Sequence, residues 1–154
     1  MLHNLLIAAH AACGLVAFAL GVIVRRLRAS GVSPLFRSYL GALWLMVALL
    51  IAVVAVDWGA IAPAVRALYG ALTALALYTG WRGWRALRAL RSPAVAPGDY
   101  IEDVGFTLIT LFDGFVIIGA LDLGSPVWLV VIVGVLGVLV GRLGIRRVKE
   151  RAAA

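Results

Sequence analysis

Five long apolar runs fill most of this 154-residue chain and decide which folds are open to it. A helix that crosses a bilayer needs ~20 mostly apolar residues, and four of the runs come close to that length unaided. The remaining run, Ala67–Trp81, reaches it as Ile61–Trp81 if Arg66 extends its guanidinium to the interface. The other four are Leu5–Val24, Tyr39–Val56, Val104–Leu121 and Leu123–Gly141.

Composition favours lipid as the solvent for these runs. Hydrophobic residues make up 64% of the chain and charged residues 14%, which is more apolar surface than a soluble domain of this length could bury. The runs lack the apolar–polar alternation of a membrane β-barrel. We therefore predict an all-α integral membrane bundle in which residues 1–154 form a single transmembrane domain. Its five transmembrane helices are expected at about residues 2–24, 34–56, 61–91, 100–121 and 126–148.

Basic residues predict the orientation of the chain. With five spans, 13 of the 14 Lys and Arg residues fall on one side of the membrane, and only Arg66 falls on the other. The positive-inside rule then places the N-terminus outside and the C-terminus in the cytoplasm. The net charge of +7 is gathered at helix ends, which favours anionic lipid headgroups over nucleic acid as partners. Four arginines after the third span are interpreted as headgroup contacts or as an orientation signal alone: Arg82, Arg85, Arg88 and Arg91.

Capping residues mark two of the expected helix starts. Ser33-Pro34 offers a capping hydroxyl followed by a proline at the first helical position. Asp99 with Glu102 three residues later resembles a capping box. Glu102 and Asp103 are expected to cap the fourth helix and to pair with nearby arginines.

Two ionisable residues fall inside predicted spans. Asp113 lies near the middle of its run, where a carboxylate costs ~2.5–3.5 kcal/mol and must face protein or water. His10 should lie at a similar depth in the first span, whereas His3 is near the outer interface and is expected to be solvated. We predict that His10 and Asp113 face a shared interior site. An alternative for His10 is a neutral imidazole hydrogen-bonded to a neighbouring helix. The other predicted members of the site are Thr110, Tyr69 and Thr73.

Glycines follow helical spacing in the first and last spans. Small residues at such spacing let two backbones approach closely, either within the chain or between protomers. The glycines expected at packing faces are Gly14, Gly21, Gly134, Gly137, Gly141 and Gly144.

Three charged residues are expected at the outer surface. Asp57, Arg66 and Asp122 form a candidate charge cluster, with three separately solvated charges as the alternative. Exposed ion pairs contribute only ~0–1 kcal/mol, so either arrangement is compatible with a stable bundle.

Familiar catalytic and cofactor patterns do not stand out in the sequence. One protomer cannot supply a bis-histidine haem, because His3 and His10 lie ~10 Å apart on one helix. Haem held by His10 with a non-histidine ligand, or between two protomers, stays open. A zinc site needs about four ligands, and only His10, Cys13 and Asp113 are candidates. Without a phosphate-binding loop or a nucleophile–base pattern, no enzyme, resident cofactor or metal site is predicted.

Three segments of the first half carry a family resemblance. They are Leu2-His3 followed by His10 and Gly14, then Leu35-Phe36-Arg37, and then Leu77-Tyr78-Thr79-Gly80-Trp81-Arg82 followed by Arg85. Over roughly residues 1–91 the chain thereby resembles small bacterial membrane proteins grouped as a domain of unknown function. Phe36 stands where such proteins often have a histidine. The resemblance implies a bacterial inner-membrane location and supplies no activity.

Three functional hypotheses follow from these patterns. The first is a non-enzymatic polytopic inner-membrane protein that serves as an accessory or assembly component, with another membrane subunit or a second copy as its partner. The second is a small proton-coupled transporter or channel that uses Asp113 and His10. The third is a haem- or quinone-associated redox protein with its cofactor near His10.

Overall fold

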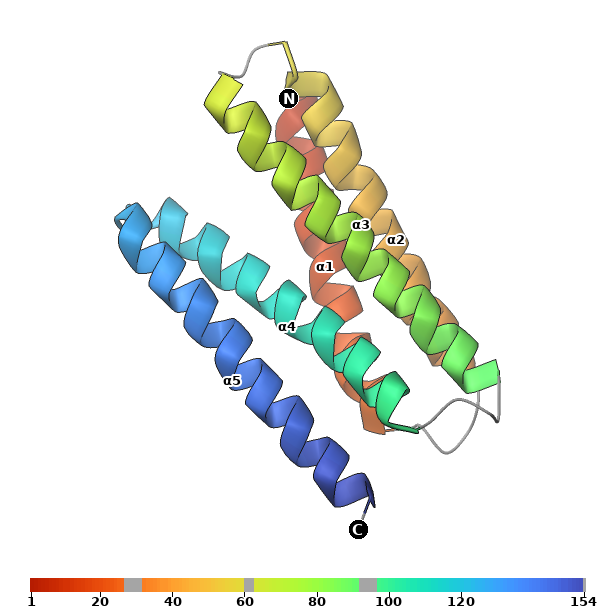
Figure 1. Cartoon of the computed structure of the whole chain (residues 1–154). Helices are drawn as coiled ribbons and strands as arrows, with labels where there is room; N and C mark the ends of the chain where they lie inside the picture. The colour runs from red at the N-terminus through yellow and green to blue at the C-terminus, as the bar shows by residue number, and fades with distance from the viewer. Residues whose placement is uncertain (27–31, 60–62, 92–96, 154) are drawn as a thin grey trace.

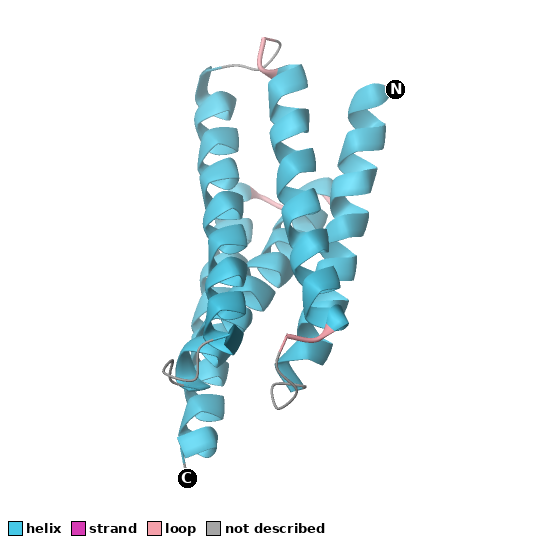
Figure 2. Cartoon of the chain, turned by 90° about the vertical axis from the view of Figure 1, so that its right-hand side faces the viewer, coloured by secondary structure: helices cyan, strands magenta, loops and turns pink. Residues whose placement is uncertain are grey.

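The computed structural model describes residues 1–26, 32–59, 63–91 and 97–153. Helices account for nearly all of these residues, and Figure 2 shows only helices and short loops among them. The helices are α1 (Leu2–Arg26), α2 (Pro34–Asp57), α3 (Pro63–Arg91), α4 (Pro97–Asp122) and α5 (Val127–Ala153). The predicted all-α fold and its five helices are confirmed, with ends that differ from expectation by a few residues.

Successive helices run in opposite directions, so the two termini lie at opposite ends of the bundle (Figure 1). α1 packs along α2, and α2 packs against α3. α4 contacts α1, α3 and α5, whereas α5 lies on the outside of the bundle and packs mainly against α4. α4 is therefore the helix that joins α5 to the rest of the molecule.

A cluster of buried aromatic side chains lies where α1 ends and where α2 and α4 begin. The ring of Phe36 sits 5.5 Å from that of Tyr39 and 6.1 Å from that of Tyr100, and all three side chains are buried. Gly21 lets α1 approach this cluster, because a Cβ at that position would lie 2.9 Å from Leu108 and 3.1 Å from Tyr39.

Large apolar side chains also cover much of the outside of the bundle, as Leu5, Ile51, Phe112 and Leu139 illustrate. An extensive apolar exterior is typical of a surface that meets lipid or another protein. α1, α2 and α4 are each long and apolar enough to cross a membrane, over Leu2–Arg25, Pro34–Asp57 and Gly98–Ala120.

Over their described residues, α3 and α5 do not meet the same requirement of length and composition. α3 has Arg66 before its apolar stretch and four arginines from Arg82 onward. α5 becomes strongly basic from Arg142. Length and composition therefore do not by themselves assign a membrane crossing to α3 or α5.

Local chemistry explains where several helices begin and end. The Phe36 backbone N–H donates to the Ser33 hydroxyl at 3.2 Å, which confirms the predicted N-cap of α2. α4 begins at Pro97, so Asp99 lies inside the first turn, and the prediction that it starts a capping box is wrong. Between α4 and α5, Gly124 adopts a φ of 75° and the Ser125 N–H donates to the Ala120 carbonyl, which closes the end of α4.

Candidate functional site

A buried ion pair joins α3 to α4. Arg82 Nε lies 2.5 Å from Asp103 Oδ1, and the two side chains are only 10% and 1% exposed. Among the described residues, neither of these two atoms has a well-aligned hydrogen-bond partner, so the contact is described as an ion pair. Such a pair needs both of its members, because removing one leaves an uncompensated charge inside the protein.

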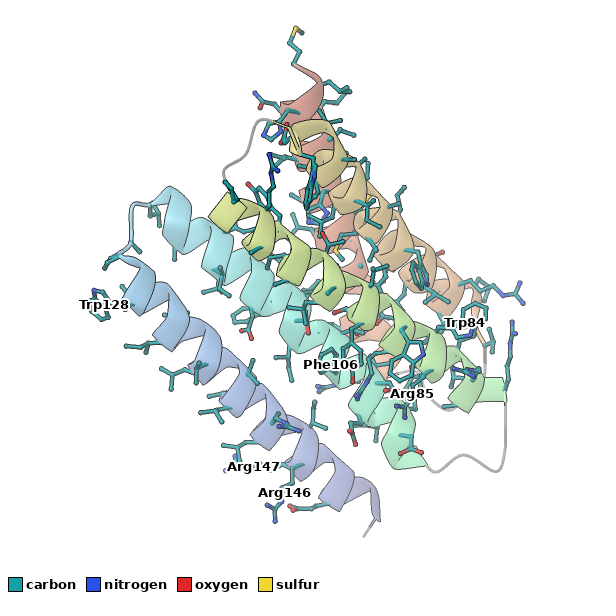
Figure 3. The ribbon with its side chains drawn as sticks, turned by 45° about the horizontal axis from the view of Figure 1, so that its top comes forward. Trp84, Arg85, Phe106, Trp128, Arg146 and Arg147 are labelled. Carbon is teal, nitrogen blue, oxygen red and sulfur yellow. The ribbon has the colours of Figure 1, made fainter. Side chains whose placement is uncertain are left out.

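Four further side chains surround this pair. Arg85 Nε lies 3.4 Å from the second Asp103 oxygen, and Arg82 reaches Glu102 at 3.5 Å. The Arg82 guanidinium donates to the Tyr78 hydroxyl at 3.2 Å and lies 4.9 Å from the centre of the Phe106 ring. Figure 3 shows Arg85 and Phe106 at the crossing of α3 and α4. We call Tyr78, Arg82, Arg85, Glu102, Asp103 and Phe106 the α3–α4 charge cluster.

The α3–α4 charge cluster corrects one prediction and confirms another. Arg82 is buried and is surrounded by the carboxylates of Asp103 and Glu102 and by the Tyr78 hydroxyl. Arg82 is therefore a charged internal residue, and its predicted role at lipid headgroups is wrong. The expected pairing of Glu102 and Asp103 with nearby arginines is confirmed.

The remaining arginines of α3 differ in their surroundings. Arg85 is half-exposed and stacks 5.1 Å from the ring of Trp81, in addition to its contact with Asp103. Arg88 and Arg91 are exposed at the same end of the helix. Headgroup contact by Arg85, Arg88 and Arg91 stays a prediction.

Two buried tyrosines, neither of which is predicted from the sequence as a site residue, form hydrogen bonds across the bundle. The Tyr39 hydroxyl donates to Thr107 Oγ1, which in turn donates to the Val104 carbonyl at 2.8 Å. The Tyr100 hydroxyl donates to the Val24 carbonyl of α1 at 2.9 Å. A tyrosine at the edge of an apolar run could have indicated such bonds, because a buried phenol usually finds a partner.

Asp113 is the second buried carboxylate of α4. It is 8% exposed and points at α5, where its Oδ1 contacts the position that a Cβ on Gly137 would occupy. Among the described residues, the carboxylate has no hydrogen-bond or ion-pair partner.

His10 faces a different helix. Its Nδ1 donates to the Met46 carbonyl of α2 at 2.8 Å, which fits the alternative of a neutral imidazole bonded to a neighbouring helix. Because His10 faces α2 and Asp113 faces α5, the contacts of the described residues do not bring the two together.

The other three members of the predicted interior site are Tyr69, Thr73 and Thr110. The two threonine hydroxyls donate to backbone carbonyls of their own helices, one of them the carbonyl of Tyr69. Thr73 Oγ1 donates to the Tyr69 carbonyl at 2.8 Å, and Thr110 Oγ1 donates to the Phe106 carbonyl at 3.1 Å. Each bond lies within one helix, a common way for a threonine to satisfy its hydroxyl in an apolar segment. These contacts give no support to a site shared by the three residues.

At the opposite end of the bundle, His3 and Asp57 form a partly exposed pair with 2.6 Å between Nδ1 and Oδ2. The expectation that His3 is simply solvated is therefore wrong. Arg66 lies 5.7 Å from the centre of the Trp58 ring. The side chain of Asp122 is outside the described residues, so the predicted cluster of Asp57, Arg66 and Asp122 stays a prediction.

The glycine faces lie within the bundle at most of the predicted positions. A Cβ on Gly14 would lie 3.1 Å from Phe115, and one on Gly134 would lie 3.2 Å from Ile117. Gly137 and Gly141 are closer still to α4, whereas Gly144 faces open space. Three of the four α5 glycines therefore allow α5 to lie against α4, and Gly144 does not take part.

Comparison with known proteins finds no matching family model, no similar curated protein and no similar solved structure. Among the residues that the structure describes, no group of three or more His, Cys, Asp or Glu side chains could hold a metal ion.

Proposed function

We propose that this chain is a non-enzymatic polytopic protein of the bacterial inner membrane that acts as an accessory or assembly component of a membrane complex. It crosses the membrane five times, with the N-terminus outside and the C-terminus in the cytoplasm. α3 then completes its span by extending Arg66 to the outer interface, and α5 ends in the cytoplasm with its basic turns.

One observation carries the proposal: within the described part of the chain, the buried polar side chains other than Asp113 are ion-paired or hydrogen-bonded to one another or to the backbone. Arg82 is paired with Asp103, Tyr39 with Thr107, and the Tyr100 hydroxyl with a backbone carbonyl. Groups used in this way stabilise helix contacts, and they are not free to bind or activate a substrate. A protein built like this is suited to hold a defined shape against a partner.

Topology reporters and co-purification test the proposal. Fusions after residues 26, 59, 91, 122 and 153 should alternate, with cytoplasmic reporters active after the first, third and fifth of them. Affinity-tagged protein should then co-purify with a second membrane protein at a constant ratio. Matching activity of reporters at both termini would contradict the five spans. A stable single-protein preparation that carries a Soret band would favour the redox hypothesis instead.

A further inference from the structure

Asp113 has a place in the bundle unlike that of any other described acidic residue. Its carboxylate lies in the contact between α4 and α5, against the face formed by Gly134, Gly137 and Gly141. The missing side chain of Gly137 makes the space that the carboxylate occupies. A larger residue there would push it out, so the two positions form one packed unit.

No described cation balances this carboxylate from any helix that packs against α4. From α1, the ionisable side chains in this part of the span are Cys13, whose thiol supplies no positive charge, and His10, which already donates to the Met46 carbonyl. From α3, the polar groups at that depth are Tyr69 and Thr73. Along α5, the first cation after Gly137 is Arg142, which is exposed and ~7.5 Å further along the helix axis.

The neutral form of the side chain is the one that suits this contact. An ionised carboxylate in mid-span costs ~2.5–3.5 kcal/mol, and here neither a cation nor a described hydrogen-bond donor offsets that cost. We propose that Asp113 is a proton-binding site in the α4–α5 contact, and that its protonation state sets how closely α5 packs on α4. The proposal rests on the membrane placement of these two helices given above.

Proton release has a direct structural consequence. The charged carboxylate needs water or a cation, and neither fits against the glycine face while α5 is closely packed. α5 is the helix best able to give way, because it lies on the outside of the bundle and packs mainly against α4. Protonated Asp113 therefore allows α5 to pack closely on α4, and release of the proton weakens this packing.

Carbodiimide labelling tests the proton site directly. Protein is reconstituted in liposomes of phosphatidylcholine and phosphatidylglycerol and treated with dicyclohexylcarbodiimide, which enters the bilayer. A protonated carboxyl gives its proton to a carbodiimide nitrogen while its oxygen adds to the central carbon, and the product rearranges to a stable N-acylurea. We expect one adduct, located on Asp113 by peptide mass spectrometry, whose rate of formation falls about tenfold per pH unit once the acid ionises.

Two variants and a second reagent complete this test. Asp113→Asn should abolish the adduct, whereas Glu150→Gln, which alters an exposed acid, should leave it unchanged. No adduct on Asp113 at any value between roughly pH 5 and 9 would overturn the proton site. Labelling by a water-soluble carbodiimide as readily as by the hydrophobic one would instead contradict the membrane placement of α4, so the two failures can be told apart.

A cysteine pair tests the movement of α5. A Cβ built on Gly105 lies 3.9 Å from the Ile145 Cβ, within the range of a disulfide, and Ile145→Cys removes the atoms that would clash. Gly105→Cys and Ile145→Cys are combined in a Cys13→Ala background, with either Asp113 or Asn at position 113. The two backgrounds are compared at the same pH, because thiolate formation itself speeds cross-linking as pH rises.

Equal cross-linking is expected at acidic pH. At alkaline pH the Asp113 background should cross-link several-fold more slowly than the Asn background, because only the carboxyl ionises. Equal rates across the whole range would overturn the proposed control of α5.

Discussion

α4 carries two buried carboxylates, ten residues apart, in opposite surroundings. Asp103 faces α3 and has two arginines within 3.5 Å, whereas Asp113 faces a glycine of α5 and has no described cation beside it. Both are more than nine-tenths buried. The contrast teaches that burial alone does not decide how a carboxylate acts in this bundle, since the partner helix supplies charge in one case and only space in the other.

The two carboxylates should differ most in stability when the ion pair between Asp103 and Arg82 is broken. Asp103→Asn leaves the Arg82 guanidinium buried without its main counter-charge, and we expect a loss of ~3–5 kcal/mol in the free energy of unfolding. Unfolding in mixed micelles with increasing dodecyl sulfate measures it. Glu102→Gln, at a side chain 48% exposed, is the control and should change the value by only ~0–1 kcal/mol. Equal effects of the two variants would contradict the role given to Asp103.

The next largest loss of stability is expected when the space that Asp113 occupies beside Gly137 is filled. Gly137→Ala places a methyl group where the carboxylate lies, so α5 or Asp113 must shift at a cost of ~1–3 kcal/mol. Gly144→Ala is the matched control on the same helix, because nothing lies within 4 Å of that position. It should be neutral or stabilising by up to ~1 kcal/mol, since alanine favours helix over glycine. If both changes have the same sign in the same unfolding assay, the glycine face is not a packing surface.

A smaller loss of stability is expected at the hydrogen bond between Tyr39 and Thr107, a residue of α4 that lies between Asp103 and Asp113. Tyr39→Phe removes the hydroxyl that donates to Thr107, which should lower the free energy of unfolding by ~0.5–1.5 kcal/mol. Tyr69→Phe removes the hydroxyl of a half-buried tyrosine for which no bond is described, and the change should stay within ~0.5 kcal/mol. A larger loss at Tyr69 than at Tyr39 would show that the polar contacts of the bundle have been misplaced.

The smallest effect at acidic pH belongs to Asp113→Asn. Asparagine resembles the neutral acid in shape, so the free energy of unfolding should change by less than ~1 kcal/mol under those conditions. Because the folded chain holds the proton and the unfolded chain releases it more readily, the wild-type protein should lose stability as pH rises. Unfolding measured over the pH range should therefore show the variant overtaking the wild-type protein on the alkaline side. If the free energies of unfolding of the wild-type protein and the variant changed with pH in parallel, Asp113 would not differ from Asp103 in the way described.

The sequence was a good guide to what lies along each helix. Apolar run length predicts the five helices, and Ser33 predicts the start of α2, because both depend on local chemistry. The neighbouring arginines likewise indicate an ionic role for Glu102 and Asp103.

What lies between helices was predicted less well. Depth along the membrane suggested that His10 and Asp113 meet, but equal depth does not determine which way a side chain points around its helix. On α4, Leu108 and Phe115 face the glycines of α1, which turns Asp113 toward α5. Arg82 was expected at headgroups for a similar reason: its position past the apolar run indicates the end of the span, but not that α4 brings Asp103 against it.

The bond from Tyr100 to the Val24 carbonyl has a consequence for how the chain is made. The last carbonyls of a helix generally lack an N–H donor from the same helix, and the phenol that donates to the Val24 carbonyl belongs to a residue 76 positions later in the chain. A ribosome therefore finishes three helices before this carbonyl receives its phenol. Until then the Val24 carbonyl must accept a hydrogen bond from water or from a lipid headgroup. α1 therefore reaches its final position only after α4 has been synthesised and has packed against it.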